Sequence, residues 1–320
     1  MVKIDLITGF LGSGKTTFIR EYAKYLVSQG ERICIIENDY GAVNIDMVLL
    51  QDLFGENCNL EMIVGGDGQE AHRRRFRTKL ISMGMSGYTR VIIEPSGIYD
   101  VDEFFDVLYD EPLDRWYEIG NVISIVDASS VSSLEGMSRY LFMSEIAHAG
   151  KIVVSKISDG MDVPEVISNV NSIMFEFGLG KENSWFDPSK DFITKHYDEF
   201  TETDFKSLAG CGYRHASYVK LPLEDKQFTP LFYFDVEISE DNLRKIAESL
   251  FKDTNAGKVI RIKGFVKTGD NSQIEFNATE NEMKIAPVVS SRNVLIIIGE
   301  ALNKEYINSI LKDYCKVVSL

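Results

Sequence analysis

One glycine-rich stretch near the start of the chain constrains the fold more than any other feature. Residues Gly9–Thr17 read G-F-L-G-S-G-K-T-T; the apolar run Ile4–Thr8 precedes them, and a segment with apolar residues at helical spacing follows. A strand, a tight glycine turn and a helix, in this order, form the context in which G-x-x-x-x-G-K-[ST] binds phosphates. Glycines let backbone N–H groups approach a phosphate closely, and the helix N-terminus adds partial positive charge. We therefore predict a nucleotide site; a glycine-rich turn without a ligand is the alternative.

The residue types in this stretch suggest individual roles. Lys15 is expected to reach the β- and γ-phosphates, and the Thr16 hydroxyl is expected to ligate Mg²⁺. We assign nucleotide binding to Gly9, Gly12, Ser13, Gly14, Lys15, Thr16 and Thr17.

The first half of the chain alternates apolar strand patterns with helical patterns. The strand candidates are Ile4–Thr8, Arg32–Glu37, Leu60–Val64, Arg90–Glu94, Val122–Asp127 and Lys151–Ser155. Their nearly continuous apolar character is typical of strands that are buried on both faces. Helical patterns cover Gln69–Met83, Asp102–Leu108 and Pro164–Phe177. We predict an α/β fold in which a mostly parallel sheet carries helices on both faces and ligands bind at the carboxyl ends of the strands.

The pattern changes in the second half. Glycine and proline interrupt the segment before Arg214, so we predict a nucleotide-binding domain at 1–180, a junction at 181–214 and a smaller α+β domain at 215–320. Alternation over Phe232–Ile238 predicts a half-buried strand, and Ser239 is expected to cap the next helix. Further strands are expected around Val259–Lys267, Gln273–Ala278, Met283–Val289 and Val294–Ile298, and a last helix around Tyr306–Leu311.

Carboxylates follow two of the predicted strands. Glu37 and Asp39 end the second strand, and Glu94 ends the fourth, just before Ser96 and Gly97. Such carboxylates can hold Mg²⁺ or orient an attacking water, and a neighbouring glycine N–H can sense a γ-phosphate. Helix capping by Asn38 or Asp39 is the alternative for that strand end.

The residue types at these positions suggest specific roles. We propose catalytic roles for Lys15, Glu37, Asp39 and Glu94, Mg²⁺ ligation by Thr16, Glu37 and Glu94, and γ-phosphate sensing by Ser96 and Gly97.

The sixth predicted strand ends in residues that can contact a nucleobase. Ser155 and Lys156 are followed by Asp159. The aliphatic stem of a lysine can lie over a purine, and a carboxylate can accept from guanine N–H donors that adenine lacks at the same positions. We assign Ser155, Lys156 and Asp159 to nucleotide binding; an exposed strand-end turn is the alternative.

Together the motifs resemble those of the CobW family of P-loop GTPases, which are relatives of the GTPases that insert nickel into urease and hydrogenase. The matches are Gly9–Thr17, Glu37–Gly41 for E-N-[ED]-[FY]-G, Glu94–Gly97 for E-x-S-G, Ile125–Asp127 for a strand ending in V-D, Arg261–Gly264 for R-[AI]-K-G and Ile297–Gly299 for a late I-G. The resemblance covers nearly the whole chain. It implies a GTP-hydrolysing switch that uses Mg²⁺ and assists a client metalloprotein or corrinoid protein, with a possible homodimer.

Two motifs of the family are altered. The C-x-C-C motif, which the family uses for a transition metal such as Zn or Co, is replaced by Val64–Gln69, which contains no cysteine. Cys58, Asp67 and His72 are the alternative ligands for a substitute metal site. The glycines of Gly65–Gln69 suggest a loop near the nucleotide or a partner. At base recognition, N-K-x-D becomes Ser155–Ser158, with Asp159 one residue late.

Two other functions are left open, the first of them by the altered base motif. One is an ATP-using phosphotransferase or ATPase acting on a small molecule, and the other is a module that holds nucleotide with little turnover.

Composition restricts the partners. A net charge of −15 argues against nucleic acid or an anionic membrane as a partner, and the basic cluster Arg73–Arg77 is interpreted as a solvated helix face. Four scattered cysteines, a first strand that contains Lys3 and Asp5, and the lack of a long apolar run favour a cytoplasmic protein without a signal peptide or membrane span.

Overall fold

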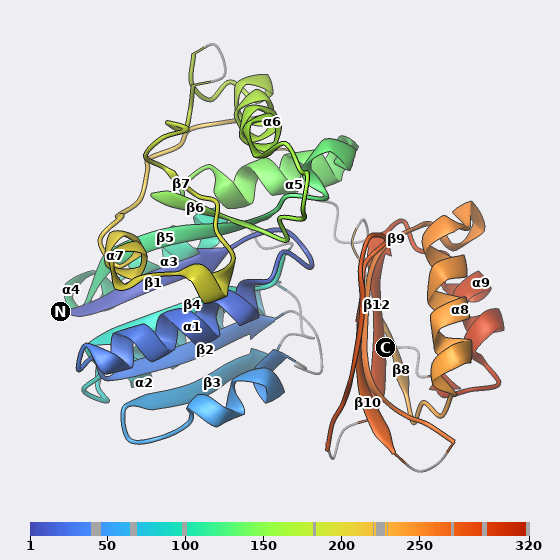
Figure 1. Cartoon of the computed structure of the whole chain (residues 1–320). Coiled ribbons are helices and arrows are strands. Elements are labelled where there is room, and N and C mark those ends of the chain that lie inside the picture. Colours follow the sequence, from blue (N-terminus) through green and yellow to red (C-terminus); the bar gives the residue numbers. More distant parts are fainter. Residues whose placement is uncertain are drawn as a thin grey trace. The chain divides into compact units, whose positions relative to one another are not determined.

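The computed structural model describes residues 1–39, 46–64, 69–97, 101–181, 184–219, 221, 228, 230–269, 272–289 and 293–317. The chain divides into two compact units, Met1–Leu221 and Pro222–Leu320, which Figure 1 shows in blue to yellow and in orange to red.

A seven-stranded parallel sheet forms the centre of the first unit (Figure 1). The strand order is β3-β2-β4-β1-β5-β6-β7. The strands are β1 (Val2–Thr8), β2 (Ile33–Asp39), β3 (Cys58–Val64), β4 (Arg90–Pro95), β5 (Tyr117–Asp127), β6 (Lys151–Ser155) and β7 (Phe192–Ile193). Every neighbouring pair in this order is parallel. The predicted α/β fold class is confirmed.

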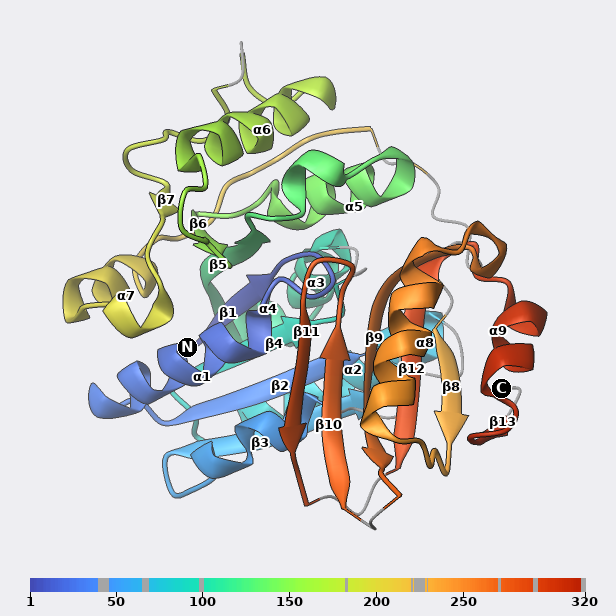
Figure 2. The ribbon, with the colours of Figure 1, turned by 45° about the vertical axis from the view of Figure 1, so that its right-hand side comes forward.

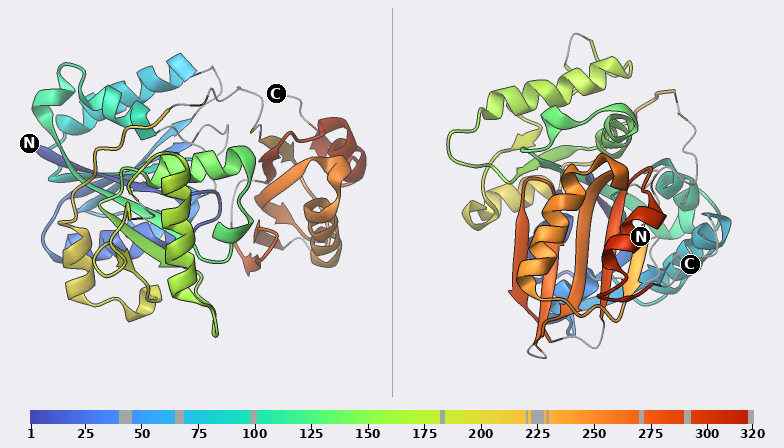
Figure 3. Two further views of the ribbon diagram at one scale, coloured as in Figure 1. Left: turned by 90° about the horizontal axis from the view of Figure 1, so that it is seen from above. Right: turned by 90° about the vertical axis from the view of Figure 1, so that its right-hand side faces the viewer.

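Helices cover both faces of this sheet (Figure 3). They are α1 (Lys15–Ser28), η1 (Asp46–Leu53), α2 (Gln69–Gly84), α3 (Val101–Leu108), α4 (Leu113–Trp116), η2 (Val131–Ser133), α5 (Gly136–Ile146), α6 (Val163–Glu176), η3 (Tyr197–Glu199) and α7 (Glu202–Leu208). One core contains apolar side chains of α1, η1 and α7, and the other contains those of α2, α3 and α4.

The alternation of side chains along β2 explains why its sequence is apolar throughout. Ile33 and Ile35 pack into the core beside α1, whereas Cys34 and Ile36 pack into the core beside α2. Because successive residues of a strand point to opposite faces, a strand between two helical layers needs apolar residues at every position.

The segment 181–214, which we expected to be a junction, contributes β7 and α7 to the first unit. Ile193 and Leu208 are buried in the core that contains α1. The boundary between the two units falls later, between Leu221 and Pro222. Glycines and prolines show where a chain turns, but they do not show which core the intervening residues join.

The second unit is a six-stranded antiparallel sheet in the order β11-β10-β9-β12-β8-β13 (Figure 2). Its elements are β8 (Leu231–Phe234), α8 (Glu240–Lys252), η4 (Thr254–Ala256), β9 (Lys258–Lys267), β10 (Gln273–Ala278), β11 (Met283–Pro287), β12 (Val294–Glu300), α9 (Lys304–Leu311) and β13 (Lys316–Val317). Helices α8 and α9 pack on one face of this sheet (Figure 1).

Two local predictions in the second unit have different outcomes. The Ser239 hydroxyl accepts from the N–H of Asn242 at 3.4 Å, so the predicted cap of α8 is confirmed. The strand predicted over Phe232–Ile238 ends at Phe234, because Asp235 adopts φ 53° and leaves the extended conformation. In the part of the chain that the structure describes, no helix combines the length and apolar character needed to cross a membrane.

Candidate nucleotide site

The loop between β1 and α1 has a backbone that requires its glycines. Gly9, Gly12 and Gly14 have φ angles of 141°, 78° and 96°. A Cβ atom on Gly9 would lie 2.3 Å from the carbonyl oxygen of Ile125, so this position also needs the absence of a side chain. Gly14 is the N-cap of α1, whose first residue is Lys15. The loop therefore delivers the N-terminus of a helix of 14 residues to the carboxyl edge of the sheet.

The peptide groups around Gly9 are held from both sides. Its N–H donates to Glu145 Oε2 at 3.1 Å, and its carbonyl oxygen accepts from Lys15 Nζ at 2.6 Å. Glu145 belongs to α5 and is 1% exposed, and Lys15 is 8% exposed. The ammonium group of Lys15 is thus inside the loop, where a phosphate would need it.

Thr16 joins the loop to the carboxylates of the neighbouring strands. Its hydroxyl donates to Glu94 Oε1 at 2.7 Å. Glu94 pairs in register with Glu37 across β4 and β2, and the two residues are 7% and 3% exposed. Two buried carboxylates at neighbouring positions are costly unless a cation or hydrogen bonds compensate them. The structure therefore brings together the three residues assigned to Mg²⁺.

The segment after β4 touches the phosphate loop. The N–H of Ser96 donates to the carbonyl oxygen of Asn38 at 2.9 Å, which joins the ends of β4 and β2. A Cβ atom on Gly97 would lie 2.7 Å from the backbone nitrogen of Leu11. Glycine is therefore needed at position 97 for close backbone approach.

The end of β6 contacts the other side of the loop. Ser155 Oγ donates to the carbonyl oxygen of Ser13 at 2.6 Å, so this residue supports the loop backbone. Lys156 has φ 55°, and its Nζ lies 2.9 Å from Asp127 Oδ2 at the end of β5. The other Asp127 oxygen accepts from the N–H and the hydroxyl of Ser129, at 2.9 and 2.7 Å. Asp127 thereby orients Lys156.

Three assigned residues stand apart from these contacts. Thr17 is exposed in the first turn of α1. Asp159 is exposed in the turn after β6 and makes no hydrogen bond or ion pair with any described residue. Asp39 ends β2, and its side chain lies outside the described part of the chain, as do residues 40–45 and 65–68.

Tyr197 and Glu145 are site residues that the sequence analysis missed. The Tyr197 hydroxyl would lie 3.5 Å from a Cβ on Gly14, and its ring centroid is 6.1 Å from that of Phe18. Burial raises the pKa of the Tyr197 phenol above its usual value, and the nearby Asp127 carboxylate adds to the rise. Neither residue lies in a motif; a buried glutamate within an apolar helix was the one signal available for Glu145.

The structure gives no support to the substitute metal site. Asp67 lies outside the described residues, and the described ones contain no group of three or more His, Cys, Asp or Glu side chains that could hold a metal. Cys58 and His72 are both buried. Burial raises the pKa of the Cys58 thiol to about 11, which disfavours the thiolate that binds zinc.

Two family models match most of the chain. The model described as "CobW/HypB/UreG, nucleotide-binding domain" matches residues 3–176, and that described as "Cobalamin synthesis protein cobW C-terminal domain" matches residues 231–315. The chain belongs to the CobW/HypB/UreG family. The family predicted from the motifs is confirmed, and the phosphate loop lies in the CobW nucleotide-binding domain.

Several named proteins are similar to this CobW-family chain. The zinc chaperone YjiA of Escherichia coli K12 is 27% identical over 163 residues, 48% of this chain and 49% of its own length. The zinc chaperone YeiR of the same organism is 29% identical over 157 residues, 49% of this chain and 47% of its own. Zinc-regulated GTPase metalloprotein activator 1 of Schizosaccharomyces pombe is 21% identical over 167 residues, 48% of this chain and 39% of its own.

The chain spans about half the length, or less, of these curated relatives. The solved structure of Zn(II)-bound YjiA GTPase from E. coli is 15% identical, with 98% of this chain and 99% of that chain covered and a TM-score of 0.35.

Proposed function

We propose that this chain is a Mg²⁺-dependent GTP-binding and GTP-hydrolysing switch that assists the insertion of a metal or metal cofactor into a client protein. The observation that carries the proposal is the hydrogen bond from the Thr16 hydroxyl to Glu94 at 2.7 Å. Thr16 directly follows Lys15, and Glu94 pairs with Glu37 on the neighbouring strand. The ammonium group of Lys15, the Thr16 hydroxyl and the two carboxylates thus lie at one edge of the sheet. The relatives' names, zinc chaperone and GTPase metalloprotein activator, support the metal-handling part.

The donor set fits Mg²⁺. Thr16, Glu37 and Glu94 offer oxygen atoms, which this hard cation prefers, and the two carboxylates are almost fully buried. When bound, Mg²⁺ would neutralise negative charge on the β- and γ-phosphates.

The loop residues account for phosphate binding. On phosphate binding, Lys15 donates to phosphate oxygens in place of the carbonyl oxygen of Gly9. Glu145 continues to accept from the N–H of Gly9. The N–H groups at the start of α1 complete the cradle. Since Gly97 contacts the backbone of Leu11, a change of phosphate state at the loop reaches the segment after β4 directly.

In the hydrolysis step, a water oxygen attacks the γ-phosphorus and the bond from that phosphorus to the β–γ bridging oxygen breaks. The carboxylates of Glu37 and Asp39 would orient this water. GTP and water yield GDP and inorganic phosphate.

The cargo that we propose is zinc, with cobalt as the alternative, and the client is a metalloprotein or a corrinoid protein. The thiols of Cys34 and Cys58 are unsuited to hold such a cargo, because burial raises their pKa values to about 12 and about 11. A homodimer is part of the proposal, and residues 65–69 are proposed to meet the nucleotide or the client.

Titration calorimetry with GTP and with ATP, each with and without Mg²⁺, tests the nucleotide part. We expect tighter binding of GTP, strengthened by Mg²⁺. Asp159→Asn should reduce the GTP preference about 10-fold or more, because a charged hydrogen-bond partner contributes roughly 1.5–3 kcal/mol. Asp162→Asn is the matched control, since Asp162 caps α6 through Glu165 N–H and Asn caps equally well. Equal binding of GTP and ATP by the unmodified chain would remove GTP from the proposal.

The end of β6 favours a second candidate, an ATP-using phosphotransferase or ATPase. Ser155 stands where the family motif has Asn, and its hydroxyl donates to the carbonyl oxygen of Ser13. Phosphoryl transfer to a small molecule, in place of phosphate release, would favour this candidate. Tight nucleotide retention with background turnover, even with client proteins added, would indicate a binding module.

A further inference from the structure

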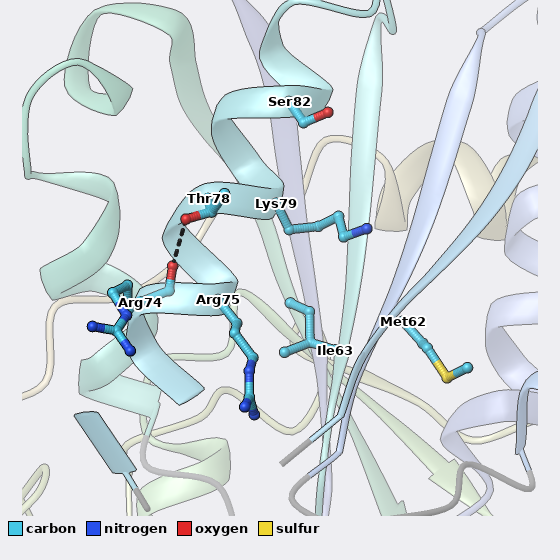
Figure 4. A pocket seen from close by; sticks show the side chains of 7 residues that line it. All are labelled: Met62, Ile63, Arg74, Arg75, Thr78, Lys79 and Ser82. Atoms are coloured by element: carbon cyan, nitrogen blue, oxygen red, sulfur yellow. Dashed lines mark hydrogen bonds between the residues drawn. The ribbon is translucent and has the colours of Figure 1, made fainter. Parts of the chain in front are cut away.

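A groove of about 760 Å³ lies between β3 and α2, the outer strand of the first sheet and the helix beside it (Figure 4). Its lining comprises Met62, Ile63, Arg74, Arg75, Thr78, Lys79 and Ser82. None of these residues belongs to the nucleotide site described above. The α2 residues are separated by steps of one, three and four positions, so they form one face of the helix.

The strand that borders the groove has an open edge. Among the described residues, β3 pairs with β2 and with no other strand. The N–H of Ile33 in β2 donates to the carbonyl oxygen of Asn57, and in a parallel ladder the peptide groups that face the partner alternate. The peptide groups of Leu60 and Met62 therefore point away from β2, as does the Cys58 carbonyl, which accepts from the N–H of Gly55.

The helix that borders the groove supplies positive charge. Arg74 and Arg75 are exposed, and Figure 4 shows Arg75 and Lys79 extending from α2 toward β3. Lys79 lies 2.8 Å from Glu61 of β3, with both side chains about 30% exposed. The charge is local, because the whole chain carries a net charge of −15.

The neighbouring basic residues Arg73 and Arg77 contact a different part of the chain. Arg73 lies 3.6 Å from Asp110, and Arg77 donates to the carbonyl oxygen of Glu111, so both are directed to the segment after α3. Neither lines the groove. The basic cluster that the sequence suggested as a solvated helix face thus separates into two pairs of arginines with different surroundings.

We propose that this groove binds an extended acidic segment of a partner protein, which pairs with the outer edge of β3 and directs its carboxylates to α2. An open strand edge offers backbone hydrogen bonds to such a segment. Carboxylates two residues apart on a strand are about 6.6 Å apart. Arg75 and Lys79, four positions apart on α2, are about 6 Å apart along its axis, so the two spacings match approximately.

The apolar side chain of Met62 favours a peptide over a polyanion. Met62 and Ile63 point to opposite faces of β3, and Ile63 is 3% exposed in the core beside α2. A segment that alternates acidic and apolar residues can direct its acidic side chains to α2 and its apolar side chains to the face of Met62. A nucleic acid would gain nothing from the strand edge, because it has no peptide N–H and C=O groups to pair with β3.

The test uses the full chain without nucleotide, so its result is independent of GTP binding. A short fluorescent peptide of alternating Glu and Val is titrated by anisotropy, and amide NMR shifts locate its site. We expect saturable binding that weakens with salt and shifts at Leu60 and Met62. The double variant Arg74→Glu, Arg75→Glu should weaken binding at least about fivefold. The matched variant Arg73→Glu, Arg77→Glu changes charge equally on the same helix and should bind nearly as the unmodified chain does.

Two further probes separate strand pairing from charge attraction. A peptide of the same sequence with alternate backbone nitrogens methylated cannot pair on one edge and should lose binding. A single-stranded oligonucleotide of equal charge should not compete. Three outcomes would each overturn the proposal. The two double variants could weaken peptide binding equally, the methylated peptide could still bind, or the oligonucleotide could bind in place of the peptide. Melting curves of both variants show whether each is folded.

Discussion

The ammonium group of Lys15 donates a hydrogen bond to the carbonyl oxygen of Gly9 at 2.6 Å, within the same loop. On the other side of that loop residue, the buried Glu145 accepts from the Gly9 N–H at 3.1 Å. The Lys15 ammonium group therefore already lies where the phosphates are proposed to bind. A phosphate oxygen needs only to replace the carbonyl oxygen of Gly9 as its hydrogen-bond acceptor.

Lys15→Ala should weaken nucleotide binding by about 10- to 100-fold, because charged hydrogen bonds contribute roughly 1.5–3 kcal/mol. Circular dichroism should show an intact fold, and titration calorimetry measures the affinity. Lys24→Ala is the control, because Lys24 lies on the same helix, half-exposed, 2.8 Å from Glu21. Normal nucleotide binding by Lys15→Ala would refute the phosphate-loop interpretation.

Glu94→Gln should make nucleotide binding much less dependent on Mg²⁺. The amide keeps an oxygen that can accept from the Thr16 hydroxyl, but it removes the negative charge beside Glu37. Titration with and without Mg²⁺ measures the difference. Glu61→Gln, at the edge of the same sheet, controls for the loss of one carboxylate. An unchanged Mg²⁺ effect in Glu94→Gln would exclude Glu94 as a ligand.

Gly97→Ala should destabilise the chain by about 1–3 kcal/mol, because the new methyl group would approach the backbone nitrogen of Leu11 to 2.7 Å. Denaturant unfolding measures the free energy. Gly55→Ala is the comparison, since a Cβ at Gly55 meets no atom within 4 Å. If both variants have the same free energy of unfolding, the close approach of Gly97 to the loop does not affect stability. A larger loss of GTP than of GDP affinity would further support γ-phosphate sensing.

The buried thiol of Cys58 and the half-buried thiol of Cys211 should make the protein less stable in strong alkali. Burial raises the pKa of Cys58 from 9.0 to about 11 and that of Cys211 to about 12. The unfolded chain loses these protons first, so the stability contribution is complete below pH 9.0 and falls as the pH rises through the folded-state values. Unfolding free energies measured from neutral to alkaline pH check the sign.

Alkylation supplies an independent check on the same thiols. Near neutral pH, Cys34, Cys58 and Cys211 should react with iodoacetamide far more slowly in the folded chain than in denaturant, because the thiolate is the nucleophile. Cys58→Ala should reduce the alkaline loss of stability. Fast modification of Cys58 in the folded chain would contradict its burial.

Much of the fold was predictable from local patterns. The loop motif, the apolar runs of β1, β2 and β4, and the carboxylates at strand ends all depend on residues that are close in sequence. Hydrophobic periodicity and glycine requirements are local physical effects, so they can be recognised without a structure. The family followed from the same motifs in combination.

Long-range packing decided the rest. Glu145 lies 136 positions from Gly9, and Tyr197 of η3 lies close to Gly14. No sequence pattern around Glu145 or Tyr197 predicts these contacts. The inclusion of β7 and α7 in the first unit, and the open edge of β3 beside Arg74 and Arg75, depend on strand order. Strand order reflects which apolar surfaces can be buried together, and that choice is made by the whole chain at once. The sequence alone therefore determined the phosphate loop and the kind of sheet. The tertiary structure decided which distant side chains support that loop and which edge of the sheet has no partner strand among the described residues.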